Sequence, residues 1–537
     1  MSELSIAVCE TPAQKRIEPR HHGTSFFQNV LANLLRVATV SLVALILPAF
    51  LIHRLSVQNY AAWVLIIQLA AYISYFDLGI QTSVAKFVAE YAANHENQTA
   101  GRYASAGLAL MIVAGALGLL VTLVLAWKVP KLFASMPADL YQQVRVSLVL
   151  VGSSLSFGLV CAVYASVFLG LQRYWIPSVL TIVNRCLFVA VVITIVALNG
   201  NLAAMGLGVA IVNVASGFLQ ILAWRREASH VPISLRLIDR FSIKRVARFC
   251  SMQSVWTIAM LCVSGLDVAI VGHYDYLQTA YYGIATMSTN FLLILICSVI
   301  NPLMPVSSAL NTRRSPEKMG KLLTRFTRYN SILVLLTGLP LIVYGPEILR
   351  IWVGADYAMH TVTYLRLLVI ANMVRNLCAP YATMITAIGK QETAMVAAIS
   401  EASVNLGSSI YLASKYGAVG VAWGTVIGAF VSVSLHFAIT MRRTRAHFDI
   451  SRARLFLEAL LRPSVIAIPS ILLFAVGSKP TDPFLAASWF LMWSGATLAV
   501  AWFVTLTANQ RNELLSFGKA FALDVAGNQF VRHFRAS

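Results

Sequence analysis

Apolar runs of about 20 residues recur along almost the whole chain, and each is long enough to cross a bilayer as a helix. Of the 537 residues, 58% are hydrophobic and only 12% are charged, whereas soluble proteins are about 25% charged. These values exclude a water-soluble multidomain enzyme and a disordered chain. Because lipid cannot satisfy free backbone groups, the runs predict helices and an all-α, polytopic membrane fold.

The hydropathy pattern predicts fourteen spanning helices. Their expected ranges are 30–52, 61–85, 104–127, 144–169, 177–198, 203–223, 250–272, 280–306, 329–349, 361–388, 392–413, 418–440, 463–477 and 484–506. The thirteenth is the weakest of these predictions, because it is short and contains two prolines.

Lys and Arg are distributed very unevenly over the connecting segments. With the N-terminus inside, thirty of them fall on inside segments and six on outside loops. Since cytoplasmic loops carry such an excess, both termini are predicted to be cytoplasmic. The same bias, with attraction to anionic lipid, accounts for the net charge of +20, so nucleic acid is not an expected partner.

The chain contains no recognisable catalytic or metal-binding motif. Its seven cysteines form no CxxC or Cys/His cluster, so no metal or cofactor is expected. The phosphate-binding pattern G-x-x-x-x-G-K-[ST] does not occur. The connecting loops are also too short for a soluble catalytic domain. We therefore expect no enzymatic activity.

A parallel internal repeat is predicted at an offset of about 217 residues. The segment Gly-Leu-Gln-Arg at 170–173 is echoed by Gly-Lys-Gln at 389–391, and Ala-Met-Gly-Leu at 204–207 by Ala-Val-Gly-Val at 418–421. Six helices separate equivalent points, so both copies have the same orientation, as in two-lobed alternating-access transporters. The expected organisation is a cytoplasmic tail (1–29), a first lobe of helices 1–6 (30–223), a basic linker (224–249), a second lobe of helices 7–12 (250–440), a basic loop (441–462), helices 13–14 (463–506) and a cytoplasmic tail (507–537).

Polar residues inside spans are costly, so they are expected to face a cavity or a partner. The residues predicted to line a substrate cavity are Asn29, Asn33, Arg36, Gln68, Tyr72, Gln253, Asn290, Asn372 and Arg375. Asp267 and Glu401 are candidates for ion coupling, with a structural alternative in which they pair with Arg185 or Arg375. Arg36 and Arg375 are the predicted substrate anchors.

Two stretches resemble a known family. The first contains Asn-Tyr-Ala-Ala-Trp at 59–63, Tyr-Phe-Asp-Leu-Gly-Ile at 75–80 and Ala-Lys-Phe-Val-Ala-Glu at 85–90. The second contains Asp-Val-Ala-Ile-Val-Gly at 267–272, Ala-Tyr-Tyr-Gly-Ile-Ala at 280–285 and Asn-Pro-Leu-Met-Pro at 301–305. Both resemble the polysaccharide-transporter branch of the MOP superfamily, the Wzx-type flippases. The segment 170–173 and the fourteen spans extend the resemblance over nearly the whole chain.

The resemblance implies a V-shaped bundle whose helices 1, 2, 7 and 8 line a central cavity. It implies transfer of an undecaprenyl-diphosphate-linked oligosaccharide from the cytoplasmic to the periplasmic leaflet of a bacterial inner membrane, in a pathway that makes lipopolysaccharide or exopolysaccharide. The implied partners are membrane lipid, an ion gradient and polysaccharide polymerase or chain-length proteins. Arginine suits a diphosphate because its guanidinium makes bidentate contacts.

Three other functions are alternatives to this one. A MATE-type cation-coupled multidrug antiporter would be expected to have an acidic, aromatic cavity, and Asp267 and Glu401 keep that alternative open. A lipid II flippase is a near relative. A membrane glycosyltransferase or polymerase would need a large outer loop, whereas the longest one here covers only about 128–143.

Overall fold

The computed structural model describes residues 22–300, 303–312, 315–476, 483–508, 510–512 and 515–516. Within these ranges the regular structure is helical and contains no strand. In the described part of the chain, twelve helices are long and apolar enough to cross a membrane, and the bent pair α14–α15 makes thirteen if it is one span. The predicted all-α polytopic fold is confirmed. Most of the two tails, and Asn301 and Pro302 of the second family stretch, lie outside the described residues.

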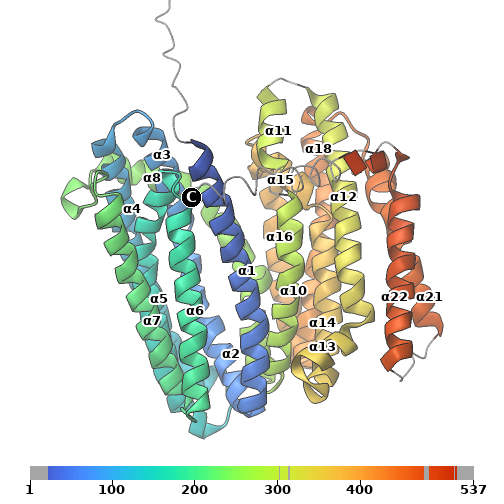
Figure 1. The fold of residues 1–537 in the computed structure, drawn as a ribbon, viewed down its shortest axis with the longest axis horizontal. Helices are drawn as coiled ribbons and strands as arrows, with labels where there is room; N and C mark the ends of the chain where they lie inside the picture. The colour runs from blue at the N-terminus through green and yellow to red at the C-terminus, as the bar shows by residue number, and fades with distance from the viewer. Residues whose placement is uncertain are drawn as a thin grey trace, which may run out of the picture.

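The first lobe forms one side of the bundle (Figure 1). Its helices are α1 (His22–Arg54), α2 (Val57–Ala71), the 3-10 turn η1 (Tyr72–Asp77), α3 (Ile80–Ala92), α4 (Asn97–Leu132), α5 (Ala138–Gly170), α6 (Trp175–Ala197) and α7 (Leu202–Glu227).

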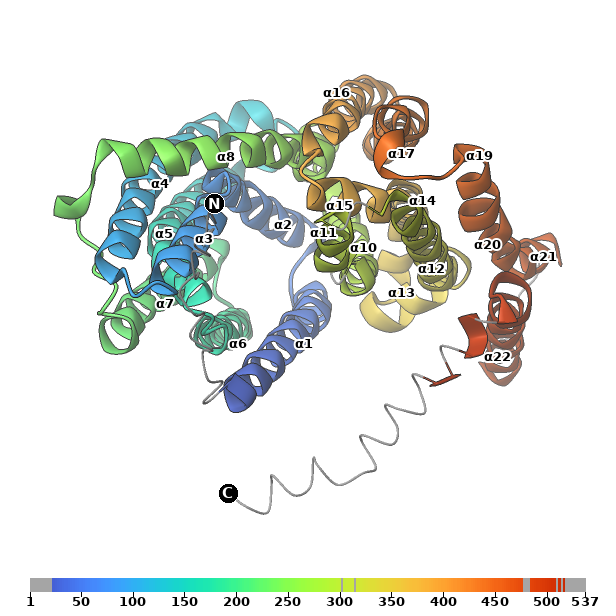
Figure 2. The same ribbon diagram turned by 90° about the horizontal axis from the view of Figure 1, so that it is seen from above.

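The second lobe stands beside it and continues into the last helices of the chain (Figures 1 and 2). It contains α8 (Arg240–Met260), a π turn η3 (Leu261–Gly265), α9 (Asp267–Tyr274), α10 (Gln278–Ile300), α11 (Leu303–Thr312), α12 (Pro316–Val343), α13 (Gly345–Val353), α14 (Ala355–Asn376), α15 (Ala379–Ala387), α16 (Gln391–Tyr416) and α17 (Ala418–Leu435). The chain continues through the short helices α18 (Met441–Arg443), α19 (Arg452–Leu455), α20 (Arg462–Ser464) and α21 (Ile468–Val476) to α22 (Pro483–Val500).

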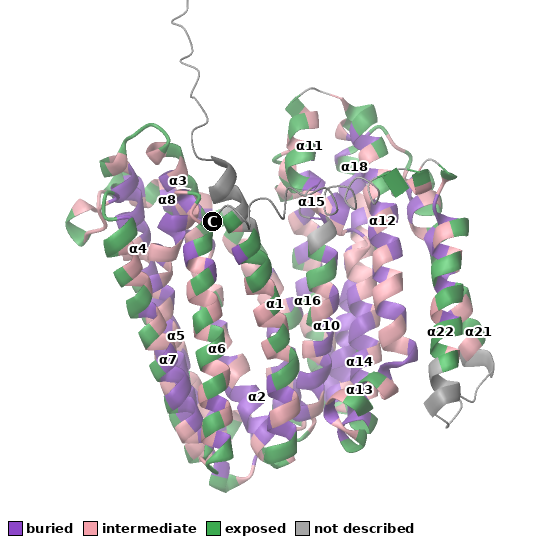
Figure 3. Cartoon of the chain, viewed as in Figure 1, coloured by how far each residue is buried: buried purple, intermediate pink, exposed green. Residues whose placement is uncertain are grey.

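The outer surface of the bundle is apolar. Exposed positions lie on the outward faces of the helices and buried positions where helices meet (Figure 3). Many exposed side chains are large hydrophobics, including Leu120 at 57%, Phe218 at 59% and Leu491 at 69% exposure. Such a surface would promote aggregation in water and is suited to contact with lipid tails.

The two lobes repeat the same local geometry. Gln172 and Gly389 both have positive φ, at +59° and +73°, and close the turns that follow α5 and α15. In each turn the next amide donates to the carbonyl five residues back, Arg173 to Phe168 and Lys390 to Ile385. This bond and the left-handed residue define a Schellman helix end. The two turns are 217 residues apart, which is the offset expected for the predicted parallel repeat.

The segment 224–249 was expected to be a linker, but much of it is helical. After α7 ends at Glu227, α8 begins at Arg240 and runs between the two lobes (Figure 2). Asp239 caps α8: its Oδ1 accepts from the Ser242 amide at 2.7 Å and its Oδ2 from the Ser242 hydroxyl at 2.7 Å. The Ser242 amide holds the pKa of Asp239 below its ordinary value. Capping by Asp explains why the helix starts before the apolar run does.

Three other helix boundaries differ from the prediction. The ninth helix ends at Val343 rather than 349, because Gly345 and Pro346 start a separate helix. The tenth bends by 40° between α14 and α15, two residues before Pro380, which cannot donate within a helix. The thirteenth span begins at Arg452 instead of 463, so the basic loop is shorter than expected. A polar helix, α16, does not qualify by hydropathy, but its 26 residues pack along α17.

Candidate functional site: a cavity between the lobes

A cavity of about 560 Å³ lies between the lobes. We call it the central cavity. Six of the predicted site residues line it: Gln68, Asp267, Asn290, Asn372, Arg375 and Glu401. They come from α2, α9, α10, α14 and α16, so helices far apart in sequence converge on one space.

Arg375 and Glu401 form an ion pair on the second-lobe wall. The Arg375 Nε lies 2.5 Å from Glu401 Oε1, and the side chains are 17% and 4% exposed. Asn372, one turn earlier on α14, accepts weakly from Arg375 at 3.5 Å. For Glu401, the structure therefore shows the ion pair with Arg375 that the sequence offered as the structural alternative to ion coupling. Arg375 therefore has its charge balanced before any ligand arrives.

Asp267 lies close to this pair and is only 5% exposed. Its Oδ2 accepts from the hydroxyls of Thr425 at 3.1 Å and Tyr282 at 3.3 Å. Its Oδ1 is buried with no hydrogen-bond partner among the described residues. A buried, half-satisfied carboxyl is costly, and a proton or a cation would complete its coordination. No described group of three or more His, Cys, Asp or Glu forms a metal cluster here.

Gln68 connects the two lobes at the centre of the cavity. Its Nε2 donates to the carbonyl of Gly265 at 2.9 Å. That carbonyl lies at the end of the π turn η3, where the α-helical hydrogen-bond pattern of helix 7 is interrupted. The first-lobe helix α2 is interrupted at nearly the same level by η1. Irregular backbone is tolerated within a membrane where it lines a cavity.

A second, smaller space of about 290 Å³ opens toward the first lobe. We call it the side chamber. It shares Gln68, Thr286 and Asn290 with the central cavity, so the two spaces adjoin. Its walls are apolar side chains from α1, α2 and α10 together with one cation, Arg185 of α6.

Arg185 is the residue whose role sequence reasoning missed. Its side chain is exposed to the chamber and makes no hydrogen bond or ion pair with any part of the chain that the structure describes. The sequence placed it among the structural partners of Asp267 or Glu401, but neither bonds to it. The sequence did contain one signal for an unpaired cation. Arg185 lies ten residues into the apolar helix α6, and α6 contains no Asp or Glu that could pair with it.

Arg36 lines neither the central cavity nor the side chamber, but it lies on the same face of α1 as residues that line the side chamber. Arg36, Val40 and Leu47 are separated by four and seven residues, a spacing that keeps side chains on one side of a helix, and Val40 and Leu47 line the side chamber. Arg36 is thus one turn nearer the start of α1. Asn33 holds its guanidinium, accepting from the terminal nitrogen at 2.7 Å and from Nε at 3.2 Å.

Three other predicted site residues lie elsewhere. Asn29 braces the turn between α5 and α6, donating to the Gln172 carbonyl at 2.8 Å and accepting from the Trp175 amide at 3.0 Å. Tyr72 is buried in η1 and does not line the central cavity, whereas its neighbour Tyr75 does. Gln253 lines a third space, beside the central cavity.

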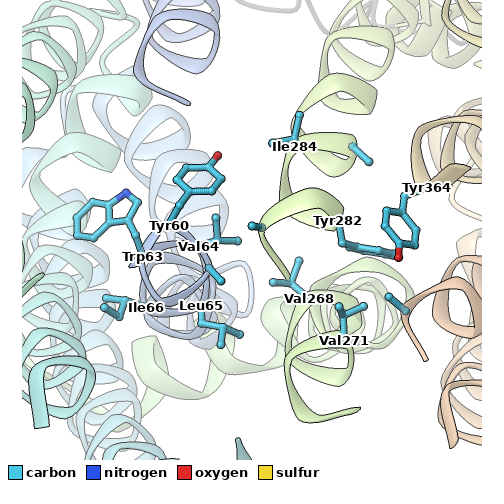
Figure 4. Packing of buried hydrophobic residues seen from close by; sticks show 14 of the residues in the cluster. Tyr60, Trp63, Val64, Leu65, Ile66, Val268, Val271, Tyr282, Ile284 and Tyr364 are labelled. Atoms are coloured by element: carbon cyan, nitrogen blue, oxygen red, sulfur yellow. The ribbon is translucent and has the colours of Figure 1, made fainter. Parts of the chain in front are cut away.

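The lobes touch at the end of the bundle away from the basic segments. There the Trp352 indole of α13 donates to the Leu45 carbonyl of α1 at 2.7 Å. Tyr60 of α2 meets Tyr357 of α14 edge-on, with ring centroids 6.2 Å apart. Buried side chains of α2, α9 and α10 pack between the lobes beneath the cavity (Figure 4). We call this the closed end, and the other, with α8 and α11, the basic end.

Comparisons with known proteins agree with this architecture. Residues 254–411 match the MatE family. The solved lipid II flippase MurJ, in an inward closed conformation, has a TM-score of 0.65 at 15% identity, covering 93% of this chain and 100% of that one. The chain has the fold of a MOP-superfamily transporter. An inward-facing MATE multidrug-resistance transporter of that superfamily also gives 0.65 at 16% identity, covering 78% of this chain and 98% of the other.

Among curated proteins, a relative in Shigella flexneri named "Putative O-antigen transporter" is 20% identical over 402 residues, which are 74% of this chain and 93% of that protein. The expected resemblance to Wzx-type flippases of the MOP superfamily is thus confirmed. The two spaces described above draw lining residues from helices 1, 2, 7 and 8, the four that the resemblance implied would line the cavity.

Proposed function

We propose that this chain is a flippase for a polyprenyl-diphosphate-linked oligosaccharide in the bacterial inner membrane, with both termini in the cytoplasm. The basic end would then face the cytoplasm, where such lipids are assembled. The O-antigen and lipid II transporters to which the chain is similar handle, by their names, glycan-bearing cargo. No covalent chemistry is required for the transfer.

The observation that carries the proposal is Arg185 in the side chamber, which has no hydrogen-bond or ion-pair partner among the residues that the structure describes. A membrane-embedded guanidinium without a counter-ion is costly, so its retention calls for an anionic ligand. A diphosphate supplies that charge and matches the planar donor geometry of arginine. Arg36, on the same side of the chamber nearer the basic end, provides a first contact. Arg375 contributes less, because Glu401 already neutralises it.

Asp267 is the better of the two candidates for ion coupling. Glu401 is committed to Arg375, whereas one oxygen of Asp267 has no partner among the described residues. Binding of a proton or a monovalent cation there would alter the hydrogen bonds to Thr425 on α17 and Tyr282 on α10. An ion gradient would in this way bias the packing of second-lobe helices that line the cavity.

Deletion of the gene in its own bacterium tests the function. Lipid-linked glycan should accumulate on the inner leaflet, and surface polysaccharide should fall. Wild-type protein should restore export fully, and Arg185→Lys should restore it partly. Arg185→Gln, present at equal abundance, should not restore it. Arg54→Gln, at the exposed end of α1, is the matched control.

The multidrug antiporter is the second candidate, and the buried Asp267 and the MATE structure favour it. It predicts a different phenotype. If deletion leaves surface glycan and its lipid-linked precursor unchanged but sensitises the cells to cationic drugs, the flippase proposal is wrong.

A further inference from the structure

A third space, of about 350 Å³, lies at the basic end of the bundle next to the central cavity. We call it the vestibule. It is lined by Gln253, Trp256, Met304, Ala382, Thr383, Thr386, Gln391, Ala394 and Met395. Trp256, Ala382 and Thr383 also line the central cavity, so the two spaces adjoin. Figure 2 shows the helices that supply these residues, α8, α11, α15 and α16, gathered at one place between the lobes.

The vestibule differs in chemistry from the spaces beyond it. None of its lining residues is charged, whereas the central cavity contains Asp267, Arg375 and Glu401 and the side chamber contains Arg185. Its polar groups are two carboxamides and two hydroxyls. An uncharged, polar and aromatic lining is poorly suited to a phosphate and well suited to a neutral molecule rich in hydroxyl groups.

Trp256 supplies a flat surface for such a ligand. The residue is 43% exposed, and its indole borders both the vestibule and the central cavity. The apolar face of a pyranose ring, with its axial C–H groups, packs against the face of an aromatic ring. Large, rigid aromatic side chains provide this contact area at low cost in conformational entropy.

Gln253 supplies hydrogen bonds beside the indole. Its carboxamide is exposed and makes no hydrogen bond to any residue that the structure describes. Its stem, however, is fixed: a Cβ added at Gly79 would lie 2.5 Å from Gln253 Cγ, so the chain of Gln253 packs directly on the turn between η1 and α3. A carboxamide offers two donors and one acceptor, which matches adjacent sugar hydroxyls.

Two threonines complete the opposite wall. The hydroxyls of Thr383 and Thr386 donate to carbonyls of their own helix, Ala379 at 3.0 Å and Ala382 at 2.9 Å. Their hydrogens are therefore committed, and their lone pairs remain as acceptors for ligand hydroxyls. The vestibule thus combines the indole of Trp256, the carboxamide of Gln253 and two hydroxyl oxygens that can accept hydrogen bonds.

We propose that the vestibule is a subsite for a neutral pyranose, a hexose or N-acetylhexosamine, with Trp256 stacking on the sugar ring and Gln253 hydrogen-bonding to its hydroxyls. This inference rests on the proposed flippase function and deepens it. The glycan occupies the vestibule while the diphosphate is held by the arginines of α1 and α6. Sugars carrying a carboxylate bind less well, because no cation lines the vestibule to balance their charge.

Binding of soluble glycosides to the purified full-length protein in detergent tests the subsite directly. The probes are methyl glucoside, methyl N-acetylglucosaminide and methyl glucuronide, observed by saturation-transfer NMR. The two neutral probes should receive saturation at their ring protons, and glucuronide much less. Trp256→Ala should weaken binding of the neutral probes by about two- to tenfold, the range for loss of one aromatic contact. Trp127→Ala, a lipid-facing tryptophan at 66% exposure, is the matched control.

Two further variants keep the inference testable if Trp256→Ala does not fold. Trp256→Phe should retain part of the signal, and Gln253→Ala should reduce it without loss of abundance. Unchanged binding in Trp256→Phe and Gln253→Ala, or stronger binding of glucuronide than of glucoside, would overturn the subsite.

Export in the deletion strain separates the two proposals. If wild-type protein restores export and these variants do so equally, the flippase function stands and the subsite is wrong. If deletion does not affect lipid-linked glycan yet neutral glycosides bind at Trp256, the subsite stands and the flippase function is wrong.

Discussion

Arg375 on α14 and Glu401 on α16 are joined by a salt bridge inside the second lobe, with Arg375 Nε 2.5 Å from Glu401 Oε1. Both side chains are removed from bulk water by the surrounding helices. A charge pair in this setting is stabilising only while both members are present, because each compensates the burial of the other.

Removing either Arg375 or Glu401 should therefore lower the stability of the protein more than it slows the transport step. Arg375→Ala or Glu401→Ala should lower the free energy of unfolding by about 3–5 kcal/mol, the usual result of leaving one buried charge alone. The double variant Arg375→Met/Glu401→Leu should recover most of that loss. Membrane abundance and thermal unfolding in detergent measure the effect. Equal stability of the single variants and wild type would show that the pair is not structural.

Arg36 is expected to act on the substrate instead. Its guanidinium is held by Asn33 through Nε and one terminal nitrogen, while the other terminal nitrogen makes no hydrogen bond to a residue that the structure describes. Arg36→Ala should reduce export by about ten- to hundredfold, since a hydrogen bond to a charged group contributes about 1.5–3 kcal/mol. Arg36→Lys should keep partial export, because it preserves the charge but loses the planar fork. Export per molecule is measured with abundance determined in parallel. Wild-type export by Arg36→Ala would place this residue at the headgroups, where long cationic side chains extend to water.

The contact between Tyr60 and Tyr357 should open during transport. These rings are 6.2 Å apart and belong to different lobes. A Tyr60→Cys/Tyr357→Cys pair joined through disulfide bonds by a short bis-methanethiosulfonate cross-linker should abolish export, because alternating access requires the lobes to separate at this end. A reductant cleaves those disulfides and should restore export. Tyr281 and Tyr357, with ring centroids 5.2 Å apart within the second lobe, provide the control. Joining that pair should leave export intact, and inhibition by both cross-links alike would contradict the model of separating lobes.

The sequence predicted the spans well, because they depend on a local signal. Hydropathy identifies lipid-facing helices. The left-handed turn at position 389 coincides with a glycine, whereas Gln172 adopts the same geometry without one. The helix ends were less predictable. The N-cap at Asp239 and the bend before Pro380 extend or divide helices independently of their mean hydropathy.

The candidate site was only partly predictable for a different reason. Polar residues within spans could be found, but their partners depend on how helices pack. Asn29 and Arg185 illustrate the two outcomes. Asn29 looked like a cavity residue and braces a turn, while Arg185 looked like an ion-pair partner and stands alone in the side chamber among the described residues. Trp256 was not distinguished from other tryptophans, because nothing in its local sequence shows that it borders two cavities.

The thirty-to-six bias of Lys and Arg predicts the orientation of the bundle. Reporter fusions after Arg248, Arg328 and Arg443 should therefore report the cytoplasm, and fusions near Ala138 and Asp356 the periplasm. A phosphatase that is active only in the periplasm and a fluorescent protein that folds only in the cytoplasm give opposite readouts at each point. A periplasmic signal after Arg328 would reverse the assignment from α10 onward.

Asp267 is expected to couple transport to an ion gradient. Its Oδ2 accepts two hydroxyl hydrogen bonds while its Oδ1 has no partner among the described residues. Asp267→Asn keeps an acceptor for Thr425 or Tyr282 but cannot gain or lose a proton, so it resembles the permanently neutral state. Export by this variant should no longer respond to collapse of the proton gradient.

The measurement uses inverted membrane vesicles loaded with lipid-linked glycan and treated with or without a protonophore. Wild-type transfer should fall when the gradient is collapsed, whereas Asp267→Asn should transfer at one slow rate in both conditions. Glu401→Gln provides the contrast, because its carboxylate is already engaged by Arg375: its abundance should fall, while the remaining protein keeps the gradient response. If Asp267→Asn is present at wild-type abundance and responds to the protonophore as wild type does, Asp267 is a packing residue whose hydrogen bonds to α10 and α17 hold the second lobe together.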